Sequence, residues 1–337
     1  MRKMRNIHQL AFDLGPAAAR KMTETKHERE IVDLIDEYLS VEMRSIYYTY
    51  SGFAMTMLPH KRIDDDKLWK RENGRLTLLV EPGAVLHNGE AIRYGVPYGS
   101  RARLIMFYLQ TEAIRTRSPI VHLGSTMTRW MRNMNISTGG RNFEQVREQA
   151  RRLSACRLTV GWVSESGYSG FRRENIVGQM IIPPAGKEGT YWEETAQLSD
   201  GFYQALLEHP VPCDGAAIRV LQSKSHAIDV YVWLCYRLHR LEKRTLVPWE
   251  ALSAQFGHGY QNFRQFKWRF KLALDQALSV YKDAKIEMTD EGLYLLPSKP
   301  AVQPRNLYQV LLPSEQGREI IPSQVIEVSA SSADIPA

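Results

Sequence analysis

Apolar side chains recur every three or four residues through long stretches of the chain, a spacing that places them on one face of a helix. Between residues 100 and 182 this spacing predicts three helices, with a short apolar strand after the first and two strands after the third. The predicted elements cover 100–115, 119–123, 126–135, 141–156, 158–164 and 172–182. Their order is typical of a helix-turn-helix with a β-hairpin wing.

The same order of elements returns in residues 225–300. A helix precedes a short strand, a second helix entered through Pro248, a turn at Gly257-His258-Gly259, a long helix and a hairpin. These elements cover 227–241, 245–247, 249–256, 262–281, 285–289 and 292–296. The repetition is one of element order and not of sequence identity. We therefore predict an α+β fold with two winged-helix domains in tandem.

The rest of the chain gives less regular patterns. Helical spacing of apolar residues predicts a helix at 27–46, and alternation around the turn dipeptide Asn88-Gly89 predicts a β-hairpin or short sheet at 75–96. The final part is rich in Pro, Ser and Ala, so we expect it to be flexible. The predicted divisions are a helical N-terminal region (1–74), a first winged-helix domain (75–184), a connector (185–224), a second winged-helix domain (225–300) and a flexible tail (301–337).

Positive charge is concentrated in the first unit. Residues 100–182 contain thirteen arginines, no lysine and five acids, which gives +8 in a chain whose net charge is +7. Residues 225–300 add +3, and the segment between the two units is mildly acidic. A basic stretch of this kind favours a polyanionic partner, because the arginine fork matches phosphate and guanine edges.

The composition excludes several other classes of protein. Cys156, Cys213 and Cys235 are far apart and odd in number, which argues against a disulfide framework and favours a reducing cytoplasm. No apolar run approaches the length of a membrane span, so we expect no membrane association. The basic first fifteen residues lack the apolar core of a signal peptide.

The third helix of the first unit carries the first set of candidate DNA-contacting residues. Packing through positions 143, 146, 150 and 153 would turn Arg141, Gln145 and Arg152 outward, so Arg152→Ala is expected to relax sequence preference. Gln149 and Arg151 would lie on the flanks, and Arg147 would reach out along its stem from the edge of the core. The alternative is a solvated helix face on which acidic residues of the same helix pair with these arginines.

The long helix of the second unit carries the second set. Arg264, Lys267, Trp268 and Lys271 share one face, and Tyr260 and Asn262 stand at the helix start, where backbone N–H groups favour a phosphate. The alternative is a basic surface helix with Trp268 half-buried in an interdomain contact. Arg172 and Arg173, in the predicted hairpin, are candidate wing residues for phosphate or minor-groove contact, or else belong to an ordinary surface hairpin.

Signals of an enzyme are weak. The chain has no phosphate-binding loop of the form GxxxxGK[ST], and its nine histidines include no His-x-His pair for a nicking metal. The acidic triplet Asp64-Asp65-Asp66 lies between two basic residues and is more typical of a solvated turn than of a metal site. We therefore expect no catalytic residues, no metal and no cofactor.

Five segments, taken together and in order, resemble plasmid replication initiators of the RepA type. They are GVPYGSRARLIMFYLQTEAIRTRS (95–118), HLGSTMTRWMRNMNISTGGRNFEQVREQARRLSAC (122–156), SKSHAIDVYVWLCYRLHRL (223–241), VPWEALSAQFGHGY (247–260) and FKWRFKLALDQALSVYKDAKIEMTDEGLYLLPSKP (266–300). The resemblance implies a cytoplasmic, non-enzymatic initiator that binds repeated sites (iterons) in double-stranded origin DNA, helps to open the origin and recruits host DnaA and the replicative helicase. It also implies repression of the protein's own gene and a shift between homodimer and monomer.

Two alternatives stay open at this point. A winged-helix transcriptional repressor would bind an inverted repeat at a promoter, whereas an initiator would bind several direct repeats. A nicking enzyme would cleave one strand of supercoiled origin DNA with Mg²⁺, and the missing His-x-His pair argues against it.

Overall fold

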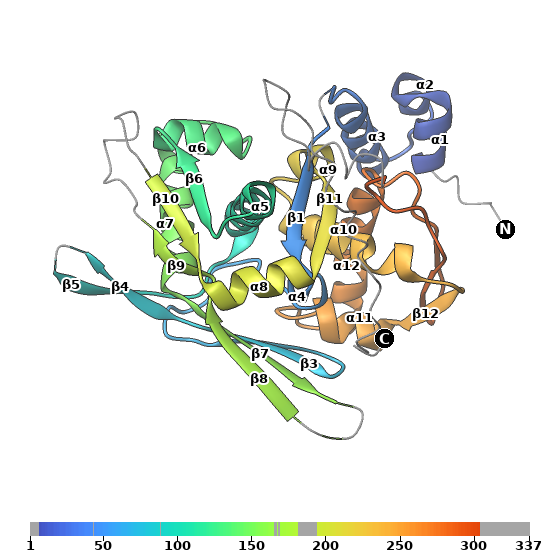
Figure 1. Cartoon of the computed structure of the whole chain (residues 1–337). Coiled ribbons are helices and arrows are strands. Elements are labelled where there is room, and N and C mark those ends of the chain that lie inside the picture. Colours follow the sequence, from blue (N-terminus) through green and yellow to red (C-terminus); the bar gives the residue numbers. More distant parts are fainter. Residues whose placement is uncertain are drawn as a thin grey trace, which may run out of the picture.

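The computed structural model describes residues 7–42, 44–87, 89–164, 167, 169–180 and 194–303. Helices combine with small antiparallel sheets rather than with one large parallel sheet, so the α+β class is confirmed (Figure 1). The strand orders are β1-β11, β6-β10-β9, β12-β14-β13, β2-β3-β7-β8 and β4-β5. The tail predicted to be flexible lies almost wholly outside the described residues.

Three helices, α1 (Ile7–Leu14), α2 (Pro16–Arg20) and α3 (Lys26–Leu39), form the N-terminal part. A capping box fixes the start of α3, because the side chain of Thr25 accepts from the backbone of Glu28 and the Glu28 carboxylate accepts from the backbone of Thr25. The predicted helix at 27–46 is too long. It ends at Leu39, and the β-branched and aromatic residues that follow begin strand β1 (Ile46–Tyr50).

The first unit comprises α5 (Gly99–Thr116), β6 (Ile120–Gly124), α6 (Met127–Asn133) and α7 (Gly140–Ala155), as predicted in order. Strand β6 pairs with β10 (Glu194–Leu198), which pairs in turn with β9 (Val177–Met180). The helices pack around a buried cluster that includes Leu109, Leu123, Met127, Trp130 and Leu153.

The hairpin predicted as a wing belongs to another sheet. Strands β7 (Arg157–Val163) and β8 (Ser169–Asn175) do form, but β7 pairs with β3 (Leu76–Glu81), which pairs in turn with β2 (Trp69–Asn73). The predicted strand 172–182 divides into the end of β8 and the whole of β9, and the strand that pairs with β6 is β10, later in the chain. The prediction was wrong because the partner strand β3 lies about eighty residues upstream of β7, and strand alternation does not identify a partner.

The predicted connector contains regular structure that pairs with distant parts of the chain. Strand β11 (Pro210–Asp214) pairs with β1, and α8 (Asp200–Glu208) and α9 (Gly215–Val220) flank it. Helix α4 (Gly52–Met55) follows β1. The predicted domain boundaries stay a prediction.

The hairpin predicted at 75–96 is present as β4 (Gly83–His87) and β5 (Glu90–Tyr94), preceded by β3. Strand β4 begins directly against the end of α7. A Cβ added at Gly83 would lie 1.9 Å from the carbonyl oxygen of Ala155, so only glycine fits this approach.

The second unit follows the predicted order closely. It comprises α10 (Ser225–Arg237), a 3-10 turn η1 (Leu238–Arg240), β12 (Thr245–Pro248), α11 (Trp249–Phe256), α12 (Phe263–Leu278), β13 (Ile286–Met288) and β14 (Gly292–Leu295). The aromatic rings of Trp249, Phe256, Phe266 and Phe270 pack edge to face or tilted in its core. Their spacing along α11 and α12 explains why these helices could be predicted.

The two units share one continuous buried core. Helix α10 contacts both α5 and α12, and a buried ion pair joins Arg103 of α5 to Asp229 of α10. This junction fixes the orientation of one unit relative to the other. No helix in the described part of the chain is both long and apolar enough to span a membrane.

Candidate nucleic-acid interface

Arg152 points into the protein and not toward solvent. Only 2% of the residue is exposed, and its guanidinium donates to Asp65 at 2.8 Å, to Glu148 at 3.0 Å and to the Val96 carbonyl at 3.2 Å. The outward orientation predicted for Arg152 is therefore wrong. The loop around Asp65 and the segment that enters α5 cover this side of α7, and a Cβ at Gly95 would lie 2.7 Å from the Arg152 Nη1.

Two further candidates on α7 are also buried. Gln149 is 3% exposed, and its side-chain oxygen accepts from the backbone N–H of Tyr98 at 2.9 Å. Arg147 is 5% exposed, so its guanidinium does not reach out from the edge of the core as predicted. These three side chains hold α7 against its neighbours and cannot contact DNA in this conformation.

The remaining candidates on α7 are at least partly accessible. Arg141 is exposed, and Gln145 and Arg151 are half-buried. The helix starts at Gly139 with no side-chain cap, which leaves first-turn N–H groups without a side-chain partner. Arg141 and Gln145, near this end, are the α7 candidates that the structure leaves accessible.

Helix α12 presents the predicted basic face to solvent. Arg264, Trp268 and Lys271 are exposed, and Lys267 is half-buried with its ammonium 4.8 Å from the ring of Phe263. Trp268 is 55% exposed, so the alternative that it is half-buried in an interdomain contact is wrong.

No carboxylate in the described part of the chain forms a salt bridge with the cations of this face. Arg269, which was not predicted from the sequence, adds one more cation to this face. Its guanidinium carbon lies 4.7 Å from the centre of the Trp268 ring. It follows Trp268 directly, and its exposure could have been inferred from the helical spacing. The face thus holds several cations around a large exposed ring, with no acid to neutralise them.

The residues at the start of α12 have structural roles. The Asn262 side-chain oxygen caps the helix by accepting from the Gln265 backbone N–H at 2.8 Å, which leaves the exposed amide NH₂ as its free donor. Tyr260 is half-buried against Phe266 and His226, and this burial raises the pKa of its phenol. The ring of Tyr260 therefore lies in an aromatic cluster rather than fully at the surface.

Arg172 and Arg173 are exposed on β8. Their strand belongs to the sheet with β7, β3 and β2, so they do not lie on the strands paired with β6. Arg173 lies 3.8 Å from the carboxylate of Glu81 across the sheet. Part of the predicted loop at 164–170 lies outside the described residues.

The arginine count of the first unit overstates its surface charge. Arg103, Arg147 and Arg152 are all 5% exposed or less, and Arg115 is paired with Glu112 on its own helix. The described residues also hold no group of three or more His, Cys, Asp or Glu able to bind a metal ion. What the surface offers is therefore a cationic and aromatic face on α12 and a smaller polar end on α7.

Residues 96–250 match the family model described as "Plasmid encoded RepA protein". The match covers less than half of the 337 residues. The resemblance predicted from the sequence is confirmed by this match for a region that runs from just before α5 into the start of α11. No curated protein sequence matches the chain.

Two crystal structures of RctB align with part of the chain. Selenomethionine derivatives of RctB domains 2 and 3 align with a TM-score of 0.47 at 12% identity, over 75% of this chain and 99% of that one. A structure of RctB domains 2-3, RctB-155-483, aligns with a TM-score of 0.39 at 11% identity, over 71% and 85%. At these values the likeness defines neither the fold nor the function of this chain.

Proposed function

We propose that the chain is a non-enzymatic plasmid replication initiator, built on two winged-helix units, that binds repeated sites at its origin. The match of residues 96–250 to the RepA family model supports the replication role. The order of helix, strand, two helices and two strands supports a winged helix in each unit, with β9–β10 and β13–β14 as the wings.

The observation that carries DNA binding is the unpaired cationic face of α12. Arg264, Lys267 and Lys271 surround the exposed Trp268, and no carboxylate of the described residues pairs with them. A helix of this width fits the major groove of B-form DNA, where cations hold phosphates and the arginine fork can pair with guanine. We propose that α12 enters a major groove and that the N-terminal half of α7 contacts a second one through Arg141 and Gln145.

The energy for opening the origin would come from binding several copies of the protein to neighbouring repeats. Bending or untwisting a DNA binding site costs several kcal/mol, which is about the free energy that a few phosphate contacts supply. Recruitment of host DnaA and the replicative helicase, autorepression and a dimer–monomer shift are parts of this proposal that rest on the family resemblance.

DNase I footprinting of the purified chain on the DNA that flanks its own gene tests the proposal. Protection at regularly spaced direct repeats is the expected result. A single palindromic footprint at the promoter would instead favour the winged-helix repressor, and cleavage of one strand with Mg²⁺ would favour a nicking enzyme.

Substitutions on α12 locate the interface. Lys271→Ala should weaken binding to all repeats alike, by about 0.5–1.5 kcal/mol, and reduce the slope of log K against log salt by about 1. The matched control is Lys282→Ala, which removes the same charge from an exposed residue beside Phe12 of α1. Equal effects of the two substitutions would show that only net charge matters and would overturn the assignment of α12.

A further inference from the structure

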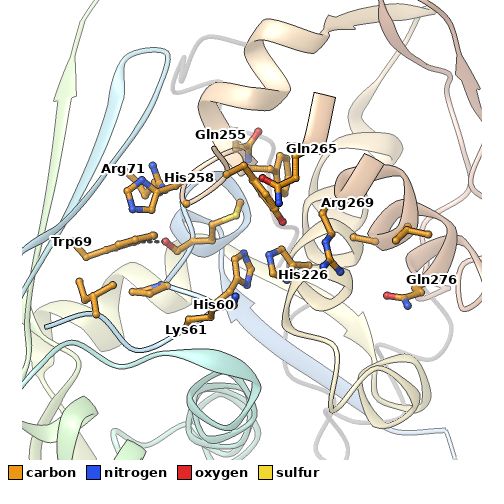
Figure 2. A pocket seen from close by; sticks show the side chains of 18 residues that line it. His60, Lys61, Trp69, Arg71, His226, Gln255, His258, Gln265, Arg269 and Gln276 are labelled. Carbon is orange, nitrogen blue, oxygen red and sulfur yellow. Dashed lines mark hydrogen bonds between the residues drawn. The ribbon is translucent and has the colours of Figure 1, made fainter. Parts of the chain in front are cut away.

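A cavity of about 410 Å³ lies between the segment that leads into β2 and helices α11 and α12. Figure 2 shows side chains from these separate elements pointing toward one another around it. Its volume falls in the range typical of small-molecule sites. Gln265, Arg269 and Gln276 of α12 line the cavity, whereas Arg264, Lys267 and Lys271 do not, so Arg269 stands at the border between the DNA-facing residues and the cavity.

The lining of this cavity is cationic. Lys61, Arg71 and Arg269 contribute three positive charges, and the residues that line the cavity include no Asp or Glu. None of the three cations takes part in a salt bridge within the described part of the chain. The nearby carboxylate of Asp229 is held by Arg103, at 2.6 Å. Three uncompensated cations around one concave site favour an anionic ligand.

Arg71 has a hydrogen-bond donor without a partner. Its guanidinium stacks over the ring of Trp69 at 4.3 Å, and its Nε is buried with no acceptor. Burial lowers the pKa of Arg71 to about 10, so the group stays charged at neutral pH. A buried donor without an acceptor is costly, and a small shift of the Arg71 side chain toward a bound anion would satisfy it.

The other walls suit an aromatic ring system. The exposed His258 meets Trp69 edge to face at 4.5 Å, and the half-buried Tyr260 also lines the cavity. The Gln265 side-chain oxygen accepts from the backbone of Gln261 at 3.2 Å, so its amide NH₂ is left to donate to a ligand. Flat aromatic walls with amide donors are typical of sites that hold a heterocycle.

We propose that this cavity binds a free nucleotide, with its phosphate against Arg71, Lys61 and Arg269 and its base against His258 and Tyr260. The arginine fork and the lysine ammonium match phosphate oxygens, and the rings supply stacking area. The proposal concerns binding alone, because the lining supplies no carboxylate to activate water. It does not depend on DNA recognition by α12.

Isothermal titration calorimetry of the full chain without DNA tests the proposal, with AMP, ATP, adenosine and inorganic phosphate as ligands. We expect one mole of AMP or ATP to bind per chain, more tightly than either adenosine or phosphate alone. Arg269→Gln and Arg71→Gln should each weaken binding at least tenfold, since each removes a charge-assisted contact. Arg269 is exposed, so its variant is expected to fold even if the Arg71 variant does not.

Arg264→Gln is the matched control, because it removes the same charge from the same helix outside the cavity, and it should change affinity less than twofold. An equal loss in this control would place the nucleotide on the DNA-facing surface and overturn the proposal. Absence of binding at millimolar nucleotide would also overturn it. A third outcome is that nucleotides fail to bind while Arg269→Gln weakens binding of a short DNA duplex more than Arg264→Gln does. The cavity would then hold a phosphate of the DNA backbone, and the proposal of a free nucleotide would be overturned.

Discussion

Removal of the Asp229 carboxylate tests how the two units are held together. Arg103 and Asp229 are 5% and 6% exposed, and the guanidinium donates to both carboxylate oxygens at 2.6 Å. It also donates to the carbonyls of Leu58, Pro59 and Gly99 at 2.8, 3.2 and 2.8 Å. In Asp229→Ala the carbonyls remain, but the buried cation loses its counter-ion. Breaking one side of such a pair costs about 3–5 kcal/mol.

Urea unfolding at pH 7.5, followed by circular dichroism and tryptophan fluorescence, measures this loss as a change in the free energy of unfolding. The matched control is Asp33→Ala, which removes the carboxylate of the exposed Arg20–Asp33 pair and should cost about 0–1 kcal/mol. The double variant Arg103→Met/Asp229→Leu removes both charges and should be much closer to the parent chain than Asp229→Ala is. If Asp229→Ala loses no more than Asp33→Ala, the junction does not depend on this pair.

Three further predictions follow from buried groups. Arg152→Ala should lower the free energy of unfolding by about 3 kcal/mol and leave the preference among DNA sites unchanged, as measured by urea titration and competition binding. The pKa of His226 is lowered to about 4, mainly by burial and then by Arg103 and other nearby cations. Below pH 6.5 the unfolded state therefore takes up a proton at this histidine that the folded state does not. His226 should contribute about 2 kcal/mol to the fall in stability between pH 7.5 and pH 5.0, and His226→Gln should remove that contribution. Gly83→Ala, whose Cβ would strike the Ala155 carbonyl, should lower the unfolding midpoint, whereas Gly74→Ala, with no atom near it, should act only through its positive φ of 57°.

The second unit could be predicted from sequence because its determinants are local. Phe266, Phe270 and Leu274 recur at helical spacing in α12, Pro248 precedes α11, and both helices follow the predicted order. The basic face of α12 could be predicted from the same helical geometry, because residues three and four positions apart lie on one side of a helix.

The errors in the first unit came from contacts between distant residues. Arg152 was expected to face solvent because its helix has an apolar stripe elsewhere, but Asp65, 87 residues away, receives it in the interior. The acidic triplet at 64–66 was interpreted as a solvated turn, and Asp64 does pair with Lys67 at the surface. Helical spacing gives the direction of a side chain relative to its own axis, but it does not show which other segment covers that side.

The unit with the larger formal charge in the sequence is not the unit with the clearest cationic face at the surface, and this difference matters for function. The first unit has the larger formal charge, but part of it is buried in Arg103, Arg147 and Arg152. The second unit has a smaller sum, yet α12 exposes its cations without acidic partners. The attraction for DNA depends on accessible charge and not on the total, because a buried and paired arginine releases no counterions from DNA.

The family match ends at residue 250, before α12 begins. The surface with the strongest physical case for DNA contact therefore lies outside the region that matches the family model, so substitutions on α12 are the more informative test of the proposed function.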